Sequence, residues 1–212
     1  MNTILIAIIV ANALFSYKGF NDHTFFRKYE FHIGSIRSGE QIRLLSSAFL
    51  HADIGHLAFN MITLYFFAPV VIGYLGTFSF VIIYFGSLIF GSLLTILFHK
   101  NDYNYRAVGA SGAVTGILYS AILLEPNMML GIFFIIPIPA YIFGILYLLY
   151  SIYGMRAKND NIGHTAHFGG AIGGFLITLI TNPHLLIENT LMVVLLMIPI
   201  VILFAMAKMG KI

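Results

Sequence analysis

The sequence predicts an all-α fold, a polytopic bundle of transmembrane helices with a six-helix core and a seventh, C-terminal helix. Charged residues make up 9% of the 212 positions and apolar residues 59%, whereas a soluble domain usually carries about 25% charged residues. Apolar runs also recur along the whole chain, and they lack the alternation that marks a membrane strand. Lipid is therefore the predicted solvent.

Seven apolar segments form the predicted spans, because a helix satisfies its own backbone hydrogen bonds in hydrocarbon. They are residues 3–17, 54–75, 78–98, 109–124, 137–153, 165–181 and 189–207. The first has no basic leader and is interpreted as a retained span rather than a signal peptide. The chain divides into a six-helix core over residues 1–181 and, over residues 182–212, an additional helix with a short basic tail.

Prolines and one short apolar segment refine these boundaries. Pro137 and Pro139 suit a helix start, where a missing N–H costs nothing. Pro183 suits a helix end, and Pro69 is expected to kink the second span. Residues 128–136 are apolar but too short to cross a bilayer.

The basic residues lie on one side of the predicted bundle, in the first, third and fifth loops and the C-terminal tail. They are Lys18, Arg27, Lys28, Arg37, Arg43, Lys100, Arg106, Arg156, Lys158, Lys208 and Lys211. The positive-inside rule would make that side cytoplasmic. The net charge of +3 is too small and too scattered for a nucleic-acid partner, and the absence of cysteine excludes disulfides and thiolate chemistry.

The first polar motif runs from His51 to Asn60. His56 and Asn60 are four residues apart, which places them on the same helix face, where both can donate hydrogen bonds to a common point. The alternative is that they only join neighbouring helices. Asp53 and Asp160 are close to helix starts and are interpreted as caps.

The second motif surrounds Ser111. Small neighbours, among them Gly109 and Gly112, expose its hydroxyl at a helix start, where free N–H groups favour an anion. It is not the nucleophile elbow of soluble hydrolases, since Ala113 occupies the position of the second glycine. The alternative is ordinary membrane packing through the spacing of Gly112 and Gly116.

The third motif places His167 at the start of a helix whose packing face carries Gly170 and Gly174. Two glycine-faced helices, one opening with serine and the other with histidine, can approach closely enough for a direct Ser–His hydrogen bond. General-base activation of a serine requires that contact. For this motif alone, a histidine that only packs at an interface is the alternative.

Together the motifs predict Ser111 as a nucleophile and His167 as its general base. His56 and Asn60 would donate hydrogen bonds to the developing oxyanion, each donor worth roughly 3 kcal/mol of transition-state stabilisation. No acidic third member is evident in the spans, so a dyad is predicted, and neither a metal nor another cofactor is expected.

These motifs, in this order, resemble those of the rhomboid family of intramembrane serine proteases. They read His51-x4-His56-x3-Asn60, Gly109-x-Ser111-Gly112 and Ala166-His167-x2-Gly170-x3-Gly174. The resemblance covers the six-helix core, roughly residues 1–181. The seventh helix has a counterpart in only some members, and it is given no catalytic role.

For the site, the resemblance implies a dyad of Ser111 and His167. It implies an oxyanion hole formed by the side chains of His56 and Asn60 and by the Ser111 backbone N–H. His51 matches a further family position with a structural role, and the glycines of the motifs are expected to support the site in the same way.

The sequence departs from the family pattern at some positions. Arg43 resembles the arginine of the family's first-loop motif, but Ile42 stands where a tryptophan often precedes it. Thr115 stands where some relatives carry a tyrosine that stacks on the catalytic histidine. The sequence therefore does not indicate which residue orients the His167 ring. Ile72 stands where an acidic residue is often found.

The function implied by the resemblance is hydrolysis of peptide bonds in or near transmembrane segments. Transmembrane proteins are the expected substrates, and membrane lipid is the other expected partner. The protein is expected to be a multi-pass protein of the plasma (inner) membrane. Its oligomeric state is not predicted. Bacterial family members generally open the active site to the extracytoplasmic side. The distribution of basic residues would instead place that side in the cytoplasm. The family topology is the working hypothesis.

Two other functions fit parts of the sequence. A non-catalytic membrane protein could use the same fold to bind or escort transmembrane segments. A metal-dependent protease or transporter is suggested by the four histidines of the motifs, His51, His56, His164 and His167. The His-Glu-x-x-His motif of zinc proteases is absent from the sequence, however, and the gap between the first two histidines does not stack on one helix face.

Overall fold

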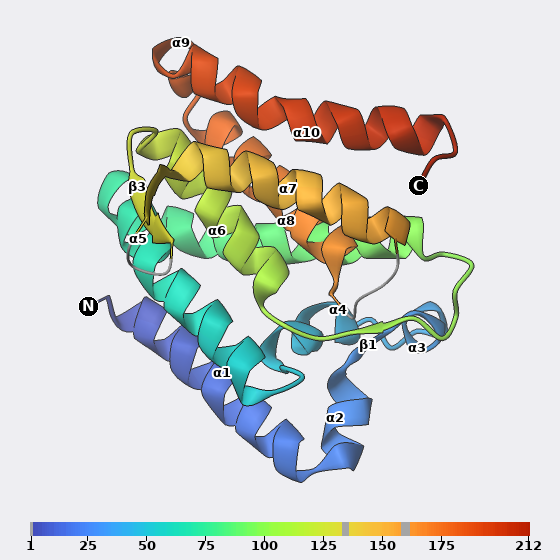
Figure 1. Ribbon diagram of the computed structural model, residues 1–212. Coiled ribbons are helices and arrows are strands. Elements are labelled where there is room, and N and C mark those ends of the chain that lie inside the picture. Colours follow the sequence, from blue (N-terminus) through green and yellow to red (C-terminus); the bar gives the residue numbers. More distant parts are fainter. Residues whose placement is uncertain (1, 133–135, 158–161) are drawn as a thin grey trace.

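The computed structural model describes residues 2–132, 136–157 and 162–212, and it shows a bundle of α-helices (Figure 1). The long helices are α1 (Thr3–Asn21), α5 (Ile54–Phe98), α6 (Ser111–Leu124), α7 (Ala140–Ala157), α8 (His164–Thr181) and α10 (Thr190–Lys208). The short helices are α2 (His23–Tyr29), α3 (Ile33–Arg37), α4 (Arg43–Ser46), η1 (Ser47–Phe49) and α9 (Leu185–Glu188). The predicted all-α transmembrane fold class is confirmed.

Helix α5 contains two of the predicted spans. It runs for 45 residues, about 67 Å at the helical rise of 1.5 Å per residue, which is twice the thickness of a hydrocarbon core. The two halves meet at Gly76, whose φ of 79° and ψ of 168° are not helical and suit a residue without a Cβ. The interruption of α5 therefore falls at Gly76, while Pro69 lies inside the helix and a kink there stays a prediction.

Several of the long helices have the length and the apolar composition of membrane spans. In the described part of the chain, α1, α5, α7 and α10 are long and apolar enough to cross a membrane, and α6 is a shorter apolar helix. Large apolar side chains such as Leu14, Ile180 and Leu191 are exposed on the outside of the bundle. Such a surface is stable in lipid and not in water. The protein is an integral membrane protein.

The centre of the bundle consists of α5, α6 and α8, whose backbones touch at glycines. A Cβ on Gly170 of α8 would lie 1.9 Å from the carbonyl oxygen of Gly112 on α6. A Cβ on Gly174 would lie 2.1 Å from the carbonyl oxygen of Gly116. On the α5 side, a Cβ on Gly169 would lie 2.5 Å from a backbone oxygen. These glycines therefore set the spacing of the three helices.

Two short antiparallel strand pairs were not predicted from the sequence. Strand β1 (Phe31–His32) pairs with β2 (Arg106–Ala107), and β3 (Met129–Ile132) pairs with β4 (Ile136–Pro139). The first pair joins the loop after α1 to the segment that leads into α6. The second contains residues 129–132 and 136 of the apolar segment 128–136, which was expected to be too short to span.

The prediction that Pro137 and Pro139 begin a helix is wrong. Both prolines lie in β4, and α7 begins after them at Ala140. The next N–H, that of Ala140, points toward β3 and donates to the Met128 carbonyl oxygen at 2.8 Å. Because successive backbone nitrogens of a strand point in opposite directions, the nitrogens of Pro139 and Pro137 face away from β3. Proline is tolerated on an edge strand in that orientation.

Other boundaries agree with the predictions. Asp53 caps α5 by accepting a hydrogen bond from the His56 backbone N–H at 2.7 Å, while Asp160 lies outside the described residues. Pro183 follows the end of α8. Helix α10 packs on α7 (Figure 1), and its first turn is fixed by Asn189, whose side chain donates to the Leu123 carbonyl oxygen at 2.8 Å.

Candidate active site

Ser111 and His167 lie in direct contact. Ser111 is the first residue of α6 and His167 lies in the first turn of α8. The Ser111 Oγ is 2.7 Å from His167 Nε2, and His167 is buried. This distance is possible because Gly112 and Gly170 let the two helix backbones touch just beyond the two side chains. The arrangement has the geometry of a serine with a hydrogen-bonded base.

The segment before Ser111 is held by backbone contacts. Gly109 has a φ of 124°, a conformation that side chains other than glycine rarely adopt. Its N–H donates to the Ser47 carbonyl oxygen at 3.0 Å. The next N–H, that of Ala110, points to His51 Nε2 at 3.4 Å. The chain therefore enters α6 in a fixed direction.

His51 connects this segment to α1. Burial, and next the charge of His56, lower the pKa of His51 to about 3, so the ring is neutral at physiological pH. Because Nε2 accepts the Ala110 N–H, Nδ1 carries the ring proton and donates to the Ser16 Oγ at 2.8 Å. Ser16 in turn donates to the Phe49 carbonyl oxygen at 3.0 Å. His51 thus has a structural place beside the site.

His56 lies beside Ser111, on the far side of Gly109. The position that a Cβ of Gly109 would occupy is 2.8 Å from His56 Nε2 and 3.7 Å from Ser111 Oγ. The His56 ring also packs edge-on against that of His51, with centroids 5.0 Å apart. His56 can therefore present a ring N–H to a group bound at Ser111.

Asn60 is buried one turn further along α5. Its side-chain amide donates to the His56 carbonyl oxygen at 3.0 Å, so one of its two N–H groups is used within its own helix. The second N–H can serve another acceptor. The oxyanion roles of His56 and Asn60 stay predictions.

Arg43 anchors the loop between α1 and α5. It is buried, and its Nη1 donates to the carbonyl oxygens of Arg27 at 2.7 Å and Glu30 at 3.0 Å. The buried Glu30 carboxylate accepts hydrogen bonds from Arg27 and from Arg106 of β2. The loop is thus tied to the strand that precedes Ser111. Ile42, at the expected tryptophan position, is 60% exposed and adds no such anchor.

Tyr147 of α7 is a site residue that sequence reasoning missed. Its hydroxyl is 2.8 Å from His167 Nδ1, and the two rings stack with centroids 5.6 Å apart and planes at 26°. Thr115, at the position where some relatives carry a tyrosine, instead donates to the Ser111 carbonyl oxygen at 2.7 Å. The histidine therefore receives its aromatic neighbour from a different helix.

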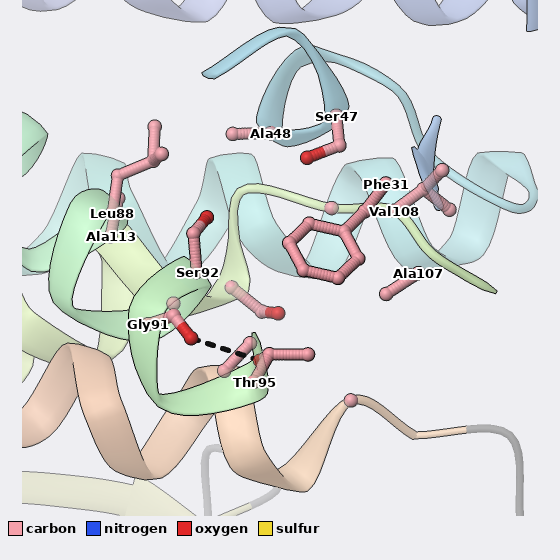
Figure 2. A pocket seen from close by; sticks show the side chains of 15 residues that line it. Phe31, Ser47, Ala48, Leu88, Gly91, Ser92, Thr95, Ala107, Val108 and Ala113 are labelled. Carbon is pink, nitrogen blue, oxygen red and sulfur yellow. Dashed lines mark hydrogen bonds between the residues drawn. The ribbon is translucent and has the colours of Figure 1, made fainter. Parts of the chain in front are cut away.

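A small cavity of about 40 Å³ has Gly109, Ser111 and Gly112 among its lining residues (Figure 2). Its lining includes Ser47, Ser92 and Thr95 as well as the backbone around Ser111. Figure 2 shows the Thr95 hydroxyl bonded to the Gly91 carbonyl oxygen of the same helix, at 2.9 Å. The volume suffices for a water molecule, and the polar groups can bind one.

Among residues 2–132, 136–157 and 162–212, no three His, Cys, Asp or Glu side chains come together as a metal site requires.

Comparison with known proteins identifies the family. The Rhomboid domain model matches residues 38–184. RHOMBOID-like protein 12, mitochondrial, of Arabidopsis thaliana is 30% identical over 79% of this chain and 55% of its own length. Putative rhomboid protease YdcA of Bacillus subtilis is 34% identical over 68% of each chain. Rhomboid protease GluP of the same organism is 34% identical over 66% of this chain and 26% of its own length.

The chain thus spans about half the length of the Arabidopsis relative and about a quarter of GluP. The matched region nevertheless contains all three polar motifs, and the domain model covers well over half of the sequence. The chain belongs to the rhomboid family.

Proposed function

We propose that this protein is an intramembrane serine endopeptidase that hydrolyses peptide bonds in or near transmembrane segments of membrane proteins. The observation that carries the proposal is the distance of 2.7 Å between Ser111 Oγ and His167 Nε2. Relatives named as rhomboid proteases support the same reaction class. A serine in hydrogen-bond contact with a histidine is the pair that serine hydrolysis needs as nucleophile and base, and this contact supports the proposal.

In the proposed mechanism, His167 Nε2 takes the proton of Ser111 as its Oγ attacks the scissile carbonyl carbon. The carbonyl oxygen becomes an oxyanion, which the His56 side chain, the Asn60 side chain and the Ser111 backbone N–H stabilise. The imidazolium then gives its proton to the leaving amine as the C–N bond breaks, leaving an acyl-enzyme. A water molecule, deprotonated by the same histidine, releases the second product.

The proposal requires water and an unwound substrate at the start of α6. A carbonyl inside a helix is hydrogen-bonded and sterically shielded, so a substrate segment has to enter between helices and open locally. The cavity that Ser111 helps to line offers space for water next to the proposed nucleophile. The proposed partners are accordingly transmembrane protein substrates and the surrounding lipid.

The membrane in which the protein lies is also a proposal. The plasma (inner) membrane fits the Bacillus relatives, whereas the Arabidopsis relative and one from Saccharomyces cerevisiae are named as mitochondrial. The proposed topology opens the site to the extracytoplasmic side.

Ser111→Ala is expected to abolish cleavage of a transmembrane reporter in proteoliposomes, with a rate loss on the order of 10⁴-fold or more. Loss of one hydroxyl removes the nucleophile without adding bulk, so the unfolding temperature is expected to stay near that of the wild type. Ser38→Ala, in an exposed loop, is the control and should cleave normally. Retained cleavage by Ser111→Ala would refute the proposed function.

A further inference from the structure

The aromatic partner of His167 comes from α7, a helix that carries none of the three polar motifs. Tyr147 Oη lies 2.8 Å from His167 Nδ1, while the opposite ring nitrogen, Nε2, lies 2.7 Å from Ser111 Oγ. The histidine ring is thus held at both nitrogens, once by the proposed nucleophile and once by the tyrosine.

The chemistry of the base fixes the direction of the tyrosine hydrogen bond. To take the serine proton, Nε2 must hold a free lone pair, so the ring proton of the neutral histidine is on Nδ1. The Nδ1–H then donates to the Tyr147 oxygen. When Nε2 becomes protonated during the reaction, the ring is a cation, and a hydrogen bond from a charged donor is stronger than one from a neutral donor.

We propose that Tyr147 is a positioning residue: its phenol oxygen accepts the Nδ1–H of His167, keeps Nε2 directed at Ser111 and makes the orientation of the base depend on the position of α7. This inference rests on the proposed function. It also accounts for Thr115, because the stacking partner that some relatives place there is supplied here from another helix.

Contacts on several sides hold α7 where Tyr147 can reach the histidine. The Tyr119 hydroxyl of α6 donates to the Gly144 carbonyl oxygen at 2.8 Å, one turn before Tyr147. A Cβ on Gly144 would lie 2.9 Å from the Ile122 side chain, so α6 and α7 are close at this point. On its other sides α7 packs against α8 and α10. A displacement of α7 would therefore withdraw the tyrosine.

The test is Tyr147→Phe, which keeps the stacked ring and removes only the oxygen. Labelling of Ser111 by a small fluorophosphonate reports activation of the nucleophile, because this probe needs neither lateral entry nor unwinding. We expect the labelling rate and the kcat for a transmembrane reporter to fall about 10- to 100-fold. The KM should change less than about twofold, because the hydrogen bond does not touch the substrate.

Tyr153→Phe is the matched control, since it removes the same oxygen from the same helix at a residue that is 59% exposed. Its labelling rate and kcat should equal those of the wild type. All variants are compared below their unfolding temperatures, so that a loss of folded protein does not enter the rates.

If the fluorophosphonate labels Ser111 in Tyr147→Phe at the wild-type rate, the inference is overturned. Unchanged labelling with faster reporter cleavage would also overturn it, because Tyr147 would then only restrain α7 against substrate entry. Failure of the proposed function gives a different result, since Ser111→Ala would then cleave the reporter or the wild type would not label at Ser111. If Ser111 is required and Tyr147→Phe behaves as the wild type, only the inference fails.

Discussion

Gly170→Ala is expected to lower the unfolding temperature of the protein and to reduce its activity by at least about 100-fold. The added Cβ would lie 1.9 Å from the Gly112 carbonyl oxygen and 2.6 Å from its carbonyl carbon. Both are backbone atoms, so no side-chain rotation relieves the overlap, and α6 and α8 have to separate. Overpacking of this kind costs about 1–3 kcal/mol or more.

The activity loss follows from the position of Gly112 next to Ser111. A shift of about 1 Å between reacting groups can cost about 10²-fold in rate, and the shift here acts directly on the contact between Ser111 and His167. Gly73→Ala is the control, since it adds the same methyl group at a glycine of α5 with no atom within 4 Å of the new Cβ. Thermal unfolding in detergent and fluorophosphonate labelling check both variants. Wild-type values for Gly170→Ala would contradict the close helix contact.

His56→Ala is expected to lower kcat about 10²- to 10³-fold while the KM changes little. The reason is that a donor to the oxyanion acts mainly in the transition state, when negative charge develops on the carbonyl oxygen. His56 Nε2 lies 2.8 Å from the position that a Cβ of Gly109 would occupy, two residues before the proposed nucleophile, and this places it for the role.

The measurement for His56 is steady-state cleavage of a transmembrane reporter. His23→Ala, at an exposed histidine of α2, is the control and should be unchanged. A variant with normal kcat and a raised KM would show that His56 binds substrate and does not stabilise the transition state.

Much of the fold could be predicted because lipid imposes a simple pattern. Most of the predicted spans are apolar runs long enough to cross the bilayer. The runs 54–75 and 78–98 were separable in the sequence, although the structure joins them into α5. Strands β1 and β2 could not be predicted, since they hold two residues each and each depends on a partner distant in the chain. Pro137 and Pro139 were misassigned because an edge strand tolerates proline as well as a helix start does.

The candidate site was predictable where its chemistry lies in local motifs. The glycines of α6 and α8 indicated a close approach, and the structure brings Ser111 and His167 together through these glycines. Tyr147 carried no comparable signal. It is one of several tyrosines on α7, and only the packing of that helix decides which of them faces the histidine.

The most direct test of the Ser111–His167 pair is covalent labelling of the purified protein with a fluorophosphonate, with the modified residue identified by mass spectrometry. The predicted result is a single adduct on Ser111 that disappears in His167→Ala and persists in His184→Ala, the latter at an exposed histidine beyond α8. An undiminished adduct in His167→Ala would contradict the assignment of the base. A folded wild-type protein that takes up no label would contradict the proposed catalysis and support a non-catalytic protein that binds transmembrane segments.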